Sequence, residues 1–265
     1  IKDYLKLPKT IQCCMLGVKL SVPIQWPARD VPIDPRILGM WLGDGFTNPD
    51  KPLVEYFKEW TEEQGGTFRV GKDYLHHSMP NCDFLQLLRR NNLFNNKHIP
   101  EEYIVNTEDV RLKVLAGLID TDGSVEQEGR TVRLTQCYEH TDIIYGAQRI
   151  ARSLGFRASI HEKKTSWESE GEIKKGIALE LTISGDGIER IPTLLPHKKC
   201  APPSGTDMCS TKIEIVEDGV GKFCGFEVDQ NNRFLLGDCT ITHNCNQTGR
   251  TVIGPDPTLK MGQLA

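Results

Sequence analysis

Two segments of the chain share an unusual pattern, in which a short apolar run of small and branched residues ends in an acidic residue and a glycine. The first reads ILGMWLGDG over Ile37–Gly45, and the second reads LAGLIDTDG over Leu115–Gly123. Each apolar run predicts a short helix, and the Asp-Gly pair predicts where it ends. One copy alone is typical of an ordinary helix stop. Two copies in one chain indicate a repeated structural unit.

The two predicted helices are suited to close packing. Both contain residues with almost no side chain, which are Gly39, Gly43, Ala116 and Gly117. Backbone-to-backbone contact is therefore expected, with Gly45 and Gly123 in the left-handed conformation just past each helix. Asp44 and Asp122 then lie at the negative ends of two helix dipoles, where an acid is disfavoured unless a cation is bound. Paired carboxylates there are suited to Mg²⁺, which prefers hard oxygen ligands and retained waters.

Each motif is followed by alternating and helix-periodic segments. After the second motif the pattern predicts strands at Ser124–Val125 and Arg130–Gln136, a helix at Asp142–Leu154 closed by Gly155, strands at Arg157–Ile160 and Gly176–Ile183, and a helix at Ile188–Leu195. After the first motif it predicts a shorter series, with a helix at Pro52–Gln64, strands at Thr67–Val70 and Tyr74–His77, and a helix at Asp83–Asn91. The short segment 46–51 leaves no room for a strand, so part of the first sheet is expected to be missing.

Composition is that of a soluble globular protein of 265 residues, with 26% charged and 38% apolar residues. No apolar run approaches the ~18 residues of a membrane span, and no signal peptide is indicated, so neither a membrane nor a secretory role is supported. The nine cysteines are scattered without a C-x-x-C pair. Reduced thiols in a cytoplasmic or nuclear compartment are expected.

The net charge of −4 is unfavourable for binding DNA unless basic residues gather on one face. The sequence shows only basic doublets, at Arg89-Arg90, Lys163-Lys164, Lys174-Lys175 and Lys198-Lys199. Each doublet is more often a solvated surface than a phosphate contact.

The paired motifs resemble those of the LAGLIDADG homing endonucleases, and the second copy departs from that pattern only at Thr121. The resemblance implies a Mg²⁺-dependent enzyme that cuts both strands of a double-stranded DNA site, with Asp44 and Asp122 as catalytic metal ligands. The stretch from Asn96 to Pro100 resembles the family's K-x-I-P block, which implies an electrostatic role for Lys97 at the cleavage site. An ordinary surface lysine is the alternative. Lys198 and Lys199 are both candidates for the second half.

The segment from Phe226 to Cys245 resembles the C-terminal splicing blocks of inteins. The resemblance implies that Asn244 attacks its own backbone carbonyl and cleaves the following peptide bond. His243 would donate a proton to the leaving amine, and Cys245 would receive the upstream acyl chain. The position at which many inteins carry a histidine before the phenylalanine corresponds here to Asn232 or Arg233, so the resemblance does not supply that assisting group.

The residues after Cys245 resemble a different protein. The stretch from Gly249 to Pro257 is similar to a segment of the largest subunit of multisubunit DNA-directed RNA polymerases. Residues 245–265 are then a C-extein, and that polymerase subunit is an expected partner. A meaningless Pro-rich tail is the alternative. No N-terminal Cys or Ser nucleophile and no T-x-x-H block precedes Asp34, so a missing N-terminal intein half is also expected as a partner.

The predicted fold class is α+β, a pseudo-twofold endonuclease of two αββαββα halves whose strands lie in the major groove, followed by C-terminal strands of a Hint splicing domain. The expected domains are a connector at 1–33, the endonuclease at 34–200, the splicing segment at 201–244 and the extein at 245–265. An alternative is a degenerate endonuclease that acts only as a splicing element. A free-standing group I intron maturase or endonuclease is disfavoured by the junction at Asn244 and Cys245.

Overall fold

The computed structural model describes residues 2–14, 16–20, 22–43, 45, 47, 50–72, 77–169, 172–202, 210–212, 215 and 233–243. The chain forms two compact units. The larger unit is Ser21–Thr206, and the smaller combines Ile1–Leu20 with Asp207–Ala265. Within the described residues, no helix is both long enough and apolar enough to cross a membrane.

Two motif helices form the centre of the larger unit. Helix α3 (Pro35–Leu42) starts at Asp34, whose side chain accepts hydrogen bonds from the backbone N–H groups of Arg36 and Ile37. Helix α7 (Glu108–Asp122) is capped by Thr107. A Cβ placed on Gly39 would lie 2.3 Å from the carbonyl oxygen of Val114 on α7. The predicted backbone-to-backbone packing of the two helices is therefore confirmed.

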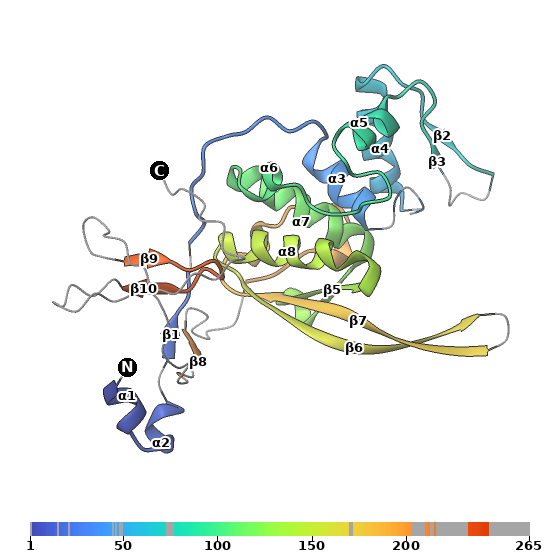
Figure 1. Cartoon of the computed structure of the whole chain (residues 1–265). Coiled ribbons are helices and arrows are strands. Elements are labelled where there is room, and N and C mark those ends of the chain that lie inside the picture. The colour runs from blue at the N-terminus through green and yellow to red at the C-terminus, as the bar shows by residue number, and fades with distance from the viewer. Residues whose placement is uncertain are drawn as a thin grey trace. The chain divides into compact units, whose positions relative to one another are not determined.

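The second motif leads into a four-stranded antiparallel sheet with the order β4-β5-β7-β6. Its strands are β4 (Gly123–Glu126), β5 (Thr131–Cys137), β6 (Arg157–Ser169) and β7 (Glu172–Ser184). Helix α8 (Thr141–Ser153) runs across one face of this sheet (Figure 1), and its buried side chains share one apolar core with those of the strands beneath. The β6–β7 hairpin is much longer than the pattern predicts and extends well past the other strands (Figure 1).

The first half of the larger unit is smaller in sheet content. It contains α4 (Lys51–Glu63), β2 (Arg69–Val70), β3 (His77–Ser78), α5 (Phe84–Arg90) and the short α6 (Glu101–Ile104). Both predicted helices are confirmed, whereas the described strands cover two residues each. Among the residues described between Gly45 and α4, none lies in a strand. The mixed helix and sheet content agrees with the predicted α+β class, and the pseudo-twofold arrangement stays a prediction.

Two local predictions are wrong. Gly45 has the expected left-handed backbone with φ +70°, but Gly123 is extended, with φ −78° and ψ 152°. Helix α7 passes directly into β4 at Gly123, where a Cβ would lie 2.6 Å from the Cα of Ile119. The predicted helix at Ile188–Leu195 is instead one 3₁₀ turn, Ile188–Arg190, followed by irregular chain, and a second 3₁₀ turn, Pro196–Lys198, comes after it. Pro192 and Pro196 lack the N–H groups that a continuous helix needs.

The smaller unit joins both ends of the described chain. It has helices α1 (Lys2–Lys6) and α2 (Lys9–Gln12), and strand β1 (Leu16–Val18) pairs with β8 (Ser210–Lys212). Strand β9 (Arg233–Leu235) forms a hairpin with β10 (Ile241–His243). Lys19 donates hydrogen bonds to Asp238 and Thr240 in this hairpin, 2.5 Å from each oxygen. The predicted strand at Cys224–Val228 lies outside the described residues.

The close contact of α3 and α7 predicts that Gly117→Ala destabilises the protein. A Cβ there would lie 2.3 Å from the carbonyl oxygen of Arg36 and 2.7 Å from the backbone nitrogen of Met40, and backbone atoms yield little. We expect the free energy of unfolding in urea to fall by about 2 kcal/mol or more. Gly146→Ala in α8 is the matched control, because its Cβ would meet only the Ile99 side chain, at 3.0 Å or more, and alanine favours the helix by about 1 kcal/mol. Equal effects of the two substitutions would contradict the close backbone packing.

Candidate functional site

The C-terminal ends of the two motif helices meet. A Cβ placed on Gly43, the residue after α3, would lie 2.2 Å from Oγ1 of Thr121 and 3.4 Å from the carboxyl carbon of Asp122. Asp122 is the last residue of α7 and is partly exposed to solvent. The predicted partner Asp44 follows Gly43 in sequence and lies outside the described residues. The described chain therefore brings Asp122 to the end of α3.

A lysine side chain caps each helix end. The Lys97 ammonium donates hydrogen bonds to the carbonyls of Trp41, Leu42 and Gly43, at 3.1, 3.2 and 3.3 Å. It also lies 5.2 Å from the centre of the Trp41 ring, within cation–π range. These contacts bring the ammonium to the negative end of the α3 dipole, where a cation is stabilised.

Lys198 does the same at the end of α7. Its ammonium donates to the carbonyl oxygens of Asp120 and Thr121, at 2.8 and 3.1 Å. Lys199 is exposed. The sequence leaves both lysines open as candidates, and the geometry favours Lys198 as the counterpart of Lys97.

Gln136 is a site residue that the sequence analysis does not identify. It lies at the end of β5, and its side-chain amide donates a hydrogen bond to the Asp122 carboxylate. Gln136 lies on the same face of β5 as Val132 and Leu134, whose side chains are buried beneath α8. A polar residue in the apolar register of a strand is the signal that marks it.

The donor atoms at the α7 end suit a hard cation. The Asp122 carboxylate and the Gln136 amide supply oxygen atoms, and a partly exposed carboxylate leaves room for retained waters. Among the described residues, no cluster of three or more His, Cys, Asp or Glu side chains is placed to hold a metal. Of the two predicted metal ligands, Asp122 is described by the structure, whereas Asp44 lies outside the described residues.

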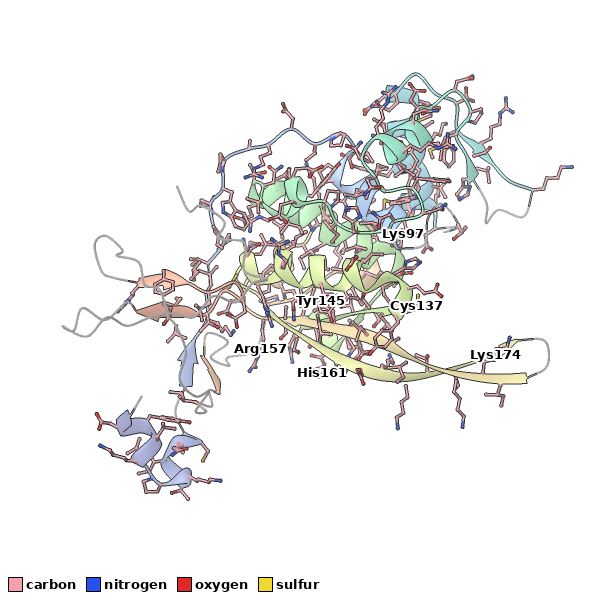
Figure 2. The ribbon with its side chains drawn as sticks, in the orientation of Figure 1. Lys97, Cys137, Tyr145, Arg157, His161 and Lys174 are labelled. Carbon is pink, nitrogen blue, oxygen red and sulfur yellow. The ribbon has the colours of Figure 1, made fainter. Side chains whose placement is uncertain are left out.

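The uncovered face of the sheet is polar and rich in cations. Alternation along the strands puts Arg133, Arg157, His161 and Lys163 on the face away from α8. Figure 2 shows Arg157, His161 and Lys174 on the β6–β7 hairpin, and Tyr145 on α8. Glu180 lies among these cations, and its hydrogen bond from Lys163 contributes most to holding its pKa below the usual value.

The predicted splicing residues lie at the end of the described chain. Strand β10 ends at His243, which pairs in register with Arg233. Asn244, Cys245 and the predicted extein fall outside the described residues. Asp238, in the turn of the β9–β10 hairpin, has its pKa lowered to about 2, because hydrogen bonds from Lys19 and Thr240 outweigh the opposing effect of burial.

Comparison with known proteins finds a similarity to homing endonucleases in part of the larger unit. The family model for the homing endonuclease matches residues 98–191, from the segment before α6 to the residue after the 3₁₀ turn Ile188–Arg190. The chain is 26% identical over 266 residues to a replicative DNA helicase DnaB of Mycobacterium intracellulare, covering 92% of this chain and 42% of the relative.

Two further relatives match shorter stretches. The catalytic subunit of a V-type proton ATPase from Candida tropicalis is 23% identical, over 58% of this chain and 14% of the relative. An ATP-dependent DNA helicase Hel308 of Thermococcus kodakarensis is 29% identical, over 57% of this chain and 15% of the relative. The chain spans less than half the length of each of these three relatives.

The capping geometry predicts unequal roles for the two neighbouring lysines in stability. Lys198→Met removes the cation from two helix-end carbonyls, so we expect the free energy of unfolding to fall by about 1 kcal/mol. Lys199→Met, the matched control, is expected to change it by less than about 0.5 kcal/mol, since its side chain is exposed. Urea unfolding of both variants measures the difference. A larger loss for Lys199→Met would reverse the assignment.

Proposed function

We propose that the larger unit is a site-specific endonuclease that cuts both strands of a double-stranded DNA target and requires Mg²⁺. The observation that carries the proposal is the meeting of two motif-helix ends, each capped by a lysine, in a unit whose residues 98–191 match the homing endonuclease family. The catalytic set in this proposal is Asp44, Asp122, Gln136, Lys97 and Lys198. Lys199 is excluded from it, because its side chain is exposed and Lys198 occupies the helix end.

The uncovered face of the sheet is the proposed DNA-binding surface. A two-stranded ribbon fits the major groove, and the β6–β7 hairpin provides such a ribbon. Arg133, Arg157 and Lys163 on this face carry positive charge, which ion pairs of Arg133 and Lys163 with Glu126 and Glu180 partly offset, and His161 adds a polar ring. Contacts to phosphates from these side chains would position the duplex, and base edges in the groove would be read by the polar residues between them.

The proposed chemistry is hydrolysis of a phosphodiester at each strand. Asp122, with Asp44, would hold a Mg²⁺ ion, which when bound acts as a Lewis acid on the phosphate and lowers the pKa of a coordinated water. Gln136 donates its amide proton to Asp122 and so fixes the orientation of the carboxylate. Lys97 and Lys198 hold positive charge where negative charge grows on the phosphate in the transition state.

A second function, protein splicing, is favoured by the smaller unit. Ile1–Leu20 and Asp207–Ala265 form one compact unit although the whole endonuclease lies between them in sequence. This is the organisation expected of an insertion into a splicing domain. The three relatives are named as two different DNA helicases and a proton ATPase subunit, and this chain matches only part of each, which supports an element that inserts into different host proteins.

In this proposal Asn244 cyclises, His243 assists the leaving amine, and Cys245 is the nucleophile for ligation. An N-terminal intein segment would supply the upstream chemistry. Residues 245–265 belong to the largest subunit of a host RNA polymerase, and that host rests on the stretch Gly249–Pro257 alone. The nine cysteines fit a reducing cytoplasmic or nuclear compartment. A degenerate endonuclease that only splices remains the alternative function.

The endonuclease proposal predicts that Asp122→Asn abolishes cleavage of both strands in Mg²⁺ and leaves DNA affinity within about threefold, because the acid holds the metal and does not grip the DNA. Targets selected from a randomised plasmid library provide the substrate, and Lys199→Met, outside the catalytic set, is the control that keeps parental activity. Asp44→Asn should behave as Asp122→Asn does. A variant of either acid that cuts at the parental rate would refute the metal-ligand assignment, and a parent that selects no target would favour the degenerate alternative.

The splicing proposal predicts slow release of the peptide 245–265, accelerated when an N-terminal intein segment is added as a separate polypeptide. Asn244→Ala should block this release, since the side-chain amide is the attacking group. Mass spectrometry follows the peptide. Equal release from the parent and from Asn244→Ala would rule out cyclisation.

A further inference from the structure

Asp120 is a buried carboxylate that the proposed cleavage chemistry does not use. It lies on α7 two residues before Asp122, and it is completely inaccessible to solvent. Burial contributes most to raising its pKa above the usual value. A carboxylate in such a place must be satisfied by hydrogen bonds or by a counter-charge to be tolerated.

The partners of Asp120 come from two other segments. Its oxygens accept hydrogen bonds from the backbone N–H of Leu194, at 3.0 and 2.9 Å, and from that of Leu195, at 3.1 Å. The guanidinium of Arg36, on α3, donates to it at 3.3 Å and is itself buried. The side chain therefore ties α7 both to the other motif helix and to the segment after the sheet.

That segment carries Lys198. Leu195 precedes the 3₁₀ turn that ends at Lys198, and the N–H of Lys198 donates to the carbonyl of Leu195 at 3.0 Å. Thr193 donates from its hydroxyl to the carbonyl of Lys198 at 3.1 Å. The Lys198 ammonium then returns to the carbonyl of Asp120 at 2.8 Å. The Asp120 carboxylate binds backbone N–H groups of the loop, and Lys198 of the same loop binds the backbone carbonyl of Asp120. The contacts therefore form a closed ring.

The first motif has a different residue at this position. Leu42, two residues before Asp44, corresponds to Asp120, two residues before Asp122, and its side chain is buried and apolar. Lys97 reaches the α3 carbonyls from the segment before α6. A carboxylate that anchors the lysine segment is thus a feature of the second motif.

We propose that Asp120 is the positioning residue for Lys198 and thereby controls cleavage of the one DNA strand that Lys198 serves. The inference rests on the proposed endonuclease function. Displacing a catalytic group by about 1 Å is enough to slow a reaction by up to about a hundredfold, so loss of the anchor has a measurable effect on that strand. Lys97 acts in cleavage of the other DNA strand, so the cleavage rate of that strand is expected to stay unchanged when Asp120 is substituted.

Strand-resolved nicking of a selected plasmid target in Mg²⁺ tests the proposal on the whole chain. Asp120→Asn keeps the shape of the side chain and loses its charge, and we expect it to slow one strand by roughly ten- to a hundredfold. Lys198→Met should slow the same strand, and Lys97→Met the opposite one. The double variant Asp120→Asn with Lys198→Met should be no slower than Lys198→Met, because both changes remove one positioned ammonium.

A purely structural role for Asp120 gives other results. Equal slowing of both strands by Asp120→Asn, or multiplication of its effect with that of Lys198→Met, would overturn the proposal. Thr193→Val is a second variant for the case in which Asp120→Asn fails to fold. It removes the hydrogen bond from Thr193 to the Lys198 carbonyl and leaves the buried charge of Asp120 unchanged. It should slow the same strand by roughly fivefold, the loss of one hydrogen bond. An effect on the opposite strand, or on neither strand, counts against the loop as the positioning element.

Pulse acetylation separates this inference from the endonuclease proposal. Amine reactivity measured by mass spectrometry needs no DNA cleavage. In Asp120→Asn we expect Lys198 to be acetylated severalfold faster than in the parent, with Lys97 unchanged. If Lys198 is equally protected in both proteins, Asp120 does not position it. If Lys198 is released while the parent cuts no selected DNA, the positioning stands and the proposed endonuclease function fails.

Discussion

The contact between the backbones of α3 and α7 is the constraint on which the site depends. Gly39 and Gly117 each face backbone atoms of the opposite helix, at distances where a Cβ would clash. Only such close helices bring the two helix ends within reach of one another, so that Gly43 lies beside Thr121 and Asp122. The small residues of the motif are therefore a condition for the chemistry as well as for the packing.

Bringing two helix C-termini together concentrates negative charge. Their carbonyl groups carry the negative ends of two dipoles, and the carboxylate of Asp122 adds to them. Lys97 and Lys198 offset this charge by hydrogen bonding directly to the carbonyls. In the proposed hydrolysis the same two ammonium groups would lie beside a bound phosphate, so one arrangement would meet the requirements of folding and of the proposed chemistry.

Much of this arrangement follows from the sequence. The repeated motif predicts the paired helices, alternation predicts β4 and β5, and helix periodicity predicts α8, all with ends close to those of the structure. The choice between Lys198 and Lys199 does not follow, because neighbouring lysines have the same local pattern and only the loop fold separates them. The roles of Gln136 and Asp120 do not follow from the sequence either. Each is a polar residue among apolar neighbours, and its role depends on a hydrogen-bond partner that is distant in sequence. The length of the β6–β7 hairpin is set by cross-strand pairing, which local periodicity does not encode.

The central claim is that the two motif ends hold one metal ion, and iron-directed self-cleavage tests it most directly. Fe²⁺ substituted for Mg²⁺ produces hydroxyl radicals with peroxide and ascorbate, and these cut the polypeptide next to the bound ion. A shared metal site predicts cuts near Gly43–Gly45 and near Thr121–Gly123 in the same protein, both suppressed in Asp122→Asn. Cuts at only one motif, or cuts near Gly43–Gly45 that survive in Asp122→Asn, would contradict a shared metal site.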